Sequence, residues 1–134
     1  MKLYEVQAAV FKVLDECFEA EGIKVGDSFD ENTPFPYIFL GEINQSRLNT
    51  KATHGKEISQ TVHVFSNFNG KEQAFEIVEK IERILNGELR IEGAYVIHNE
   101  VSRVRVFEAV RISETSAQSV EAQIVIEIQI EEEN

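Results

Sequence analysis

The segment Thr61–Leu85 constrains the fold most, because it joins a strand pattern directly to an amphipathic helix pattern. Over Ile58–Phe65, apolar residues alternate with polar ones, which is the period of a half-buried strand. After a short turn, apolar residues recur every three or four positions, which is the period of a helix with one apolar side. Asn69 and Glu72 have the spacing of a capping box at the start of that helix. The segment therefore predicts a sheet with a helix packed against it.

The residues before this segment predict a second helix and a second strand. Apolar residues at helical spacing indicate a helix over Leu3–Ala20, and Gly22 follows where a helix C-cap favours glycine. The polar residues Ile23–Asn32 are expected to form a loop. Two prolines then favour extended backbone leading into a strand over Tyr37–Ile43. This strand is apolar on both faces, so we expect both faces to be at least partly covered.

The last third of the chain is rich in strand patterns. We expect a short edge strand at Leu89–Ile91 and a longer strand at Tyr95–Ala109, with a bulge near Ser102–Arg103 where the apolar face changes. Residues Val120–Glu131 alternate between apolar and polar except at Val125, and they predict a half-buried antiparallel strand. The acidic residues 131–134 are expected to fray. The predicted class is α+β: an antiparallel or mixed sheet with two helices on one face, in the order α-β-β-α-β-β(-β).

Composition limits the chain to a few classes of protein. A length of 134 residues with 43% hydrophobic residues fits a single domain, 1–134, with one core. A net charge of −11 disfavours phosphate backbones and anionic membrane surfaces, so we expect no sequence-specific nucleic acid binding. The apolar runs are too short to cross a membrane, and we expect no membrane partner. The single cysteine, Cys17, suits a reducing cytoplasm.

The residues that could carry chemistry have no catalytic or metal-binding spacing. His63 and His98 lie on polar phases of two predicted strands and could be neighbours, but no HxH, HxxxH or CxxC pattern accompanies them, so solvated strand residues are expected. Cys17 falls on the apolar stripe of the first helix and is expected in the core. We expect no enzyme activity, no cofactor and no metal, because no nucleophile or phosphate-binding motif is present.

The segment 44–56 differs in charge from the rest of the chain. It has no acidic residue, although the chain as a whole is strongly acidic. It is expected to be a mobile basic loop or an extended hairpin arm. It could be a connection only, or it could dock on an acidic surface, including that of a sister subunit. The residues predicted to make that contact are Arg47, Lys51, His54 and Lys56.

The segments Thr33–Glu42 and Thr61–Leu85 resemble the tail-completion, or tail-terminator, proteins of long-tailed phages. The likeness lies in a PFPY lead into an apolar strand and a VHVFS strand that runs into the helix KEQAFEIVEKIERIL. The matching residues are Pro34, Phe35, Pro36, Tyr37, Gly41, Val62, His63, Val64, Phe65 and Ser66, and the helix over Lys71–Leu85 continues them.

This resemblance implies a structural virion protein, made in the host cytoplasm and located at the head-tail interface. Such a protein caps the head-proximal end of a non-contractile tail tube as a ring, with six copies expected, and joins tail to head while DNA passes through. The implied partners are copies of itself, the tail tube protein and a head-completion or connector protein. A small monomeric α+β module that binds a peptide or small ligand shares the same composition and stays the alternative.

Overall fold

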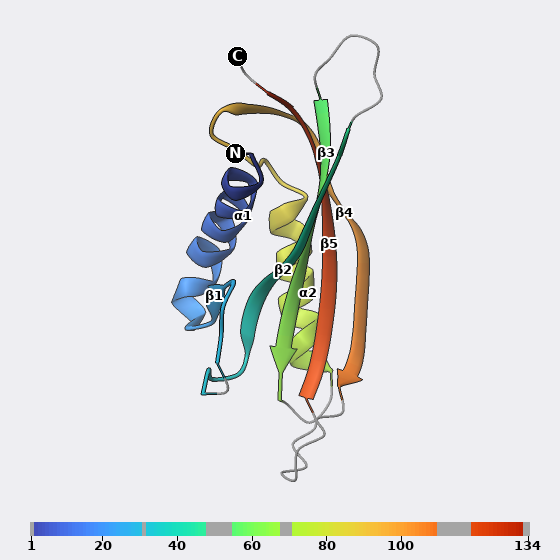
Figure 1. Cartoon of the computed structure of the whole chain (residues 1–134). Helices are drawn as coiled ribbons and strands as arrows, with labels where there is room; N and C mark the ends of the chain where they lie inside the picture. Colours follow the sequence, from blue (N-terminus) through green and yellow to red (C-terminus); the bar gives the residue numbers. More distant parts are fainter. Residues whose placement is uncertain (1, 31, 48–54, 68–70, 110–118, 133–134) are drawn as a thin grey trace.

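The computed structural model describes residues 2–30, 32–47, 55–67, 71–109 and 119–132 (Figure 1). The helices and strands among them are α1 (Lys2–Phe18), the 3-10 turn η1 (Glu19–Glu21), β1 (Lys24–Gly26), β2 (Tyr37–Arg47), β3 (Gly55–Ser66), α2 (Glu72–Leu85), β4 (Ala94–Ala109) and β5 (Ser119–Glu132). No described helix is both long enough and apolar enough to span a bilayer.

The strands form one five-stranded mixed sheet in the order β1-β2-β3-β5-β4. β1 pairs in parallel with β2, and every other pairing is antiparallel. Both helices contribute their apolar stripes to one core on one face of the sheet, with α1 beside β1 and β2 and α2 beside β3, β5 and β4 (Figure 1). The predicted α+β class is confirmed, and neither described helix lies on the opposite face of the sheet, called here the open face.

The core explains why these sequences form these elements. In β5 every second residue from Val120 to Ile130 is buried against the helices, so the predicted alternation is confirmed. In α1 the buried residues fall at every fourth position, which aligns one stripe toward the sheet. That stripe consists of Val6, Val10, Leu14 and Phe18. Cys17 lies off the stripe and is exposed, so its predicted place in the core is wrong.

The ends of the helices follow local chemistry in part. Gly22 adopts the left-handed conformation, with φ 72°, and its N–H donates to the Glu19 carbonyl at 3.0 Å, which confirms the predicted glycine cap. α2 begins at Glu72 with Lys71 in the cap position and no side-chain cap hydrogen bond, so the predicted capping box does not start this helix. Asn69 itself lies outside the described residues.

Several strand boundaries differ from the sequence-based predictions. The stretch expected as a polar loop contains β1, whose three residues pair with Tyr37–Phe39. Leu89 and Ile91 are buried in the core without forming a strand, since two apolar residues at a spacing of two give the same signal as a short strand. Glu131 and Glu132 continue β5 and pair with β4, so the predicted frayed tail is wrong for these two residues. Residues 133–134 lie outside the description.

Three irregularities bend the sheet. The bulge predicted near Ser102–Arg103 is confirmed by a register shift between Val101 and Arg103. A second shift in β4, between Val96 and His98, and a third in β2, between Leu40 and Ile43, were not predicted. Each shift leaves extra residues unpaired and increases the local twist of the strand.

Candidate interaction surfaces

The predicted basic segment is partly a strand pair. β2 extends to Arg47 and β3 begins at Gly55, so the proposed loop 44–56 is wrong at both ends. Arg47 pairs directly with Lys56 across the hairpin, and Arg47 is exposed while Lys56 is half-buried. The extended-hairpin interpretation is therefore confirmed for the described part. Lys51 and His54 lie within 48–54, outside the described residues.

An aromatic cluster covers the β1–β2–β3 end of the open face. It combines residues of the PFPY and VHVFS motifs with one ring from the segment after β1. The rings of Tyr37 and Phe65 stack with 5.0 Å between their centroids. The ring centroid of Phe29 lies 4.8 Å from that of Tyr37. Phe35 lies 5.4 Å from Tyr37. These contacts account for the confirmed expectation that both faces of the first part of β2 are covered.

His63 fits into a niche that exists because residue 41 is glycine. A Cβ atom at Gly41 would lie 2.5 Å from His63 Nε2, well inside contact distance. The imidazole also lies beside the ring of Phe39, with 5.7 Å between the ring centroids. It stacks on the ring of Phe65, with 6.1 Å between the centroids. His63 is only 9% exposed, so the prediction of a solvated strand residue is wrong. The imidazole of His63, in the VHVFS motif, thus fits only because residue 41, in the segment that follows PFPY, has no side chain.

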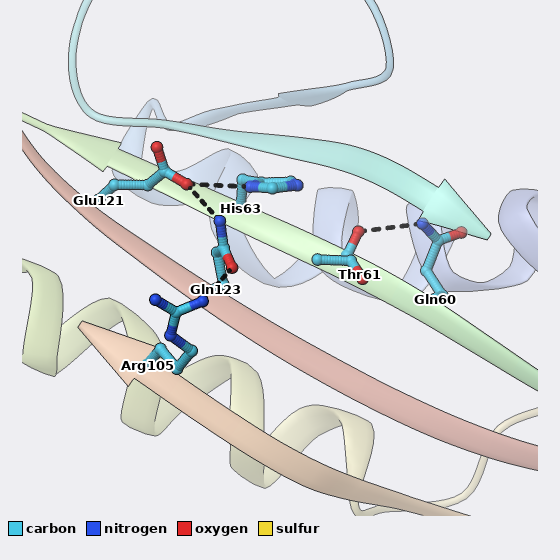
Figure 2. Close-up of polar contacts among 6 residues, drawn as sticks. All are labelled: Gln60, Thr61, His63, Arg105, Glu121 and Gln123. Atoms are coloured by element: carbon cyan, nitrogen blue, oxygen red, sulfur yellow. Dashed lines mark hydrogen bonds and ion pairs between the residues drawn. The ribbon is translucent and has the colours of Figure 1, made fainter. Parts of the chain in front are cut away.

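A chain of polar contacts runs from His63 across the open face to the far edge of the sheet (Figure 2). Glu121 Oε2 lies 3.2 Å from His63 Nδ1, and because a carboxylate only accepts, Nδ1 donates. The same oxygen accepts from Gln123 Nε2 at 2.8 Å, and Gln123 Oε1 accepts from Arg105 at 3.4 Å. The chain links β3, β5 and β4 and orients their polar side chains.

The histidines do not form a common site. His63 shares a row with Gln123, whereas His98 shares a row with Gln129 farther along β5, so the expectation that they are neighbours is wrong. His98 lies 3.5 Å from Glu100 on an exposed surface. Among the residues described, no group of histidine, cysteine or acidic side chains has the arrangement to hold a metal ion.

Acidic side chains occupy much of the open face. By strand alternation and register, this face carries Glu57, Glu100, Glu121, Glu127 and Glu131. Glu100 pairs directly with Glu127. Like charges in directly opposed positions weaken a sheet, so stability of the fold does not explain this pair.

One buried polar residue holds the bulge of β2. Gln60 is fully buried on the helix-covered face, and its Nε2 donates to the carbonyls of Gly41 at 3.1 Å and Glu42 at 3.3 Å. It also donates to the carbonyl of Thr61 at 3.0 Å. The unpaired bulge carbonyls are satisfied from inside the core, which fixes the position of the bulge. No sequence pattern indicated this role, because the carbonyls that Gln60 contacts belong to a different strand and the sequence shows only a polar residue in β3.

The outer side of α1 borders a hollow at the β1–β2 edge. It measures about 180 Å³ and lies where β1 ends and β2 continues alone. Tyr4 and Phe11 are 74% and 38% exposed, which is unusual for aromatic residues of this size. Asp27 and Glu42 line an adjoining part of the same edge. The residues that line the hollow are Tyr4, Gln7, Ala8, Phe11, Gly26, Asp27 and Leu40.

Comparison with known proteins identifies the class to which this arrangement belongs. The family described as "Tail completion protein gp17" matches the chain over residues 8–127. The chain therefore belongs to the phage tail-completion protein family and is a structural protein of the virion.

A solved structure of low sequence identity shares the fold. A chain from a structure of the virion of a native gene transfer agent (GTA) particle matches with a TM-score of 0.74 at 18% identity, covering 93% of each chain. The structure of the bacteriophage SPP1 gp17 protein matches with a TM-score of 0.49 at 20% identity, covering 100% of this chain and 96% of that one. No curated protein sequence matches the chain significantly. At these identities the first likeness supports the α+β architecture alone.

Proposed function

We propose that this protein caps the head-proximal end of a long, non-contractile phage tail tube as a ring and joins the tail to the head. The observation that carries the proposal is the family match over residues 8–127, which includes most of α1, all of α2 and the first nine of the fourteen residues of β5. Its partners are copies of itself, six in the ring, together with the tail tube protein and a head connector protein. No catalytic step is needed for this role.

The open face suits the inner wall of such a ring. Its carboxylates, which outnumber Arg103 and Arg105 on the same face, would face the DNA, and the excess of like charge would keep the genome from adhering as it passes. The directly opposed Glu100 and Glu127 support this assignment, because they weaken the sheet locally and so point to a requirement other than folding.

The basic end of the β2–β3 hairpin suits a contact between subunits or with the tube. Arg47 and Lys56 lie side by side at the end of the described hairpin, in a chain of net charge −11. Opposite charge on a partner surface would attract this end of the hairpin. Together with Lys51 and His54 they form the predicted contact segment.

A null mutant tests the function directly. A phage that lacks this protein should produce separate heads and separate tails, which electron microscopy of the lysate distinguishes from joined virions. Expression of the wild-type chain in trans is the control and should restore joining. Joined virions from the null mutant would overturn the proposal. In dilute solution the purified protein should be mostly monomeric, as measured by light scattering, because ring contacts form on the tail.

A further inference from the structure

The two edges of the sheet differ in a way that makes them complementary. β1 covers β2 only as far as Phe39, and no other described strand pairs with the outer edge of β2 beyond that residue. β4 is the last strand at the opposite edge of the sheet, so its outer side is likewise unpaired within the described residues. Such edges are open to pairing with a strand from another molecule.

The side chains at the two edges match in size and charge. Val104 on β4 is 38% exposed and lies between Arg103 and Arg105, which are both exposed. At the other edge, the hollow of about 180 Å³ beside α1 has a mixed lining, in which apolar residues such as Phe11 and Leu40 lie next to Asp27. Glu42 lines the adjoining part of the same edge. Val104 thus projects on the helix-covered side at one edge, while Arg103 and Arg105 project from the open face of the same strand. The hollow, with Asp27 and the neighbouring Glu42, lies at the other edge.

The sheet register places these features at the same level. Val104 pairs with Ile124, Ile124 with Val62, and Val62 with Leu40, which lines the hollow. The adjacent row runs from Arg103 through Val125 and Thr61 to the bulge that contains Glu42. A rotation about an axis parallel to the strands keeps each row level, so it brings Val104 of one copy opposite the hollow of the next.

The strand directions agree with this arrangement. β2 is antiparallel to β3, β3 to β5, and β5 to β4, so β2 and β4 run in opposite directions. A second copy related by the same rotation therefore presents its β4 antiparallel to β2 of the first. The two patches are different surfaces of the chain, which gives a head-to-tail contact that closes into a ring.

We propose that β4 of one copy docks along the uncovered edge of β2 in a second copy, with Val104 in the hollow beside α1 and Arg103 at Glu42. The occupant of the hollow is thus another copy of this chain. This inference rests on the proposed function, since it names the lateral contact of the proposed ring.

Cysteine cross-linking of the full chain tests the contact. In a Cys17→Ser background, Glu42→Cys and Arg103→Cys replace two exposed residues of the same row. On oxidation at millimolar protein concentration, the double variant should give a ladder of multimers. An equal mixture of the two single variants should give dimers only, because each molecule then carries one cysteine and can form one cross-link.

The single variants and a matched control separate the alternatives. Arg103→Cys paired with Glu76→Cys, an exposed residue of α2 away from β2, should not form a ladder. Strong dimer formation by either single variant alone would show a two-fold contact and overturn the proposal. Absence of a ladder above the Glu76 control would also overturn it, as would cross-linking of Glu42→Cys to the tube protein instead of to Arg103→Cys of a second copy in isolated tails.

Charge exchange gives a second test that separates this contact from the function itself. Arg103→Glu and Glu42→Arg each place like charges opposite one another and should lose complementation of the null mutant, whereas the double exchange should restore it. Circular dichroism checks that each variant is folded. If both single variants complement fully while the null mutant still fails to join heads to tails, the lateral contact is wrong and the proposed function is unaffected.

Discussion

Neighbouring residues of β5 face two different environments. Ile124 is fully buried against the helices, whereas Val125, one position later, lies half-buried on the open face. The covered face is almost entirely aliphatic, with Gln60 as its main buried polar exception. The open face combines aromatic rings at one end with a histidine–carboxylate contact and many acidic side chains. The covered face determines whether the chain folds, and we propose that the open face and the edges provide the surfaces for assembly.

The largest difference in stability between the two faces is expected when single side chains of β5 are shortened to alanine. Ile124→Ala leaves a cavity in the core and should lower the free energy of unfolding by about 2–5 kcal/mol. Val125→Ala, on the open face of the same strand, should cost about 1 kcal/mol, close to the average for point substitutions. Urea unfolding measures both. Equal losses would mean that the open face contributes as much to folding as the core does.

The buried glutamine gives the next largest effect. Gln60→Ala removes the donor that serves the bulge carbonyls of Gly41 and Glu42, so it should cost about 1–3 kcal/mol, the usual penalty for unsatisfied buried groups. Ser59→Ala, the adjacent residue on the open face, serves as control and should change stability much less. Hydrogen exchange should show faster exchange around Glu42 in the Gln60 variant. Unchanged exchange there would show that the bulge is fixed without Gln60.

The glycine–histidine niche lies on the open face and depends on one close contact. Gly41→Ala would place a methyl group against a ring that Glu121, Phe39 and Phe65 hold, so it should cost about 1–3 kcal/mol, as overpacking usually does. In a His63→Ala background the same substitution should cost much less, which a double-mutant cycle of unfolding free energies measures. Additive losses would contradict the niche.

The smallest effect on stability is expected from the basic contact segment. Replacing Arg47, Lys51 and Lys56 together with glutamate should change the free energy of unfolding by less than about 0.5 kcal/mol per site, as surface substitutions usually do. The same variant should lose the ability to join heads to tails in a complementation assay, because its charge now repels acidic partners. A variant with lysine at all three positions keeps the charge and should complement. Full complementation by the glutamate variant would mean that the segment is a connection only.

The amino-acid sequence by itself determined the class of the fold. Period-two alternation in Val120–Glu131 and period-three-to-four recurrence in the two helices are local properties, and each already states which side chains share a face. The glycine cap at Gly22 and the bulge after Val101 were predictable for the same reason, since each depends on a few consecutive residues. The motif residues of β2 and β3 also sufficed to indicate the family.

The tertiary structure alone decided which distant residues meet. His63 and Glu121 are 58 positions apart, and their contact follows from the pairing of β3 with β5, which no local pattern encodes. The position of Cys17 depended on the direction from which the sheet contacts α1. The alignment of Val104 with Leu40 needed the register of three strand pairings, and each bulge shifts that register. Local periodicity fixes the face of a residue, but only the packed sheet fixes its neighbours.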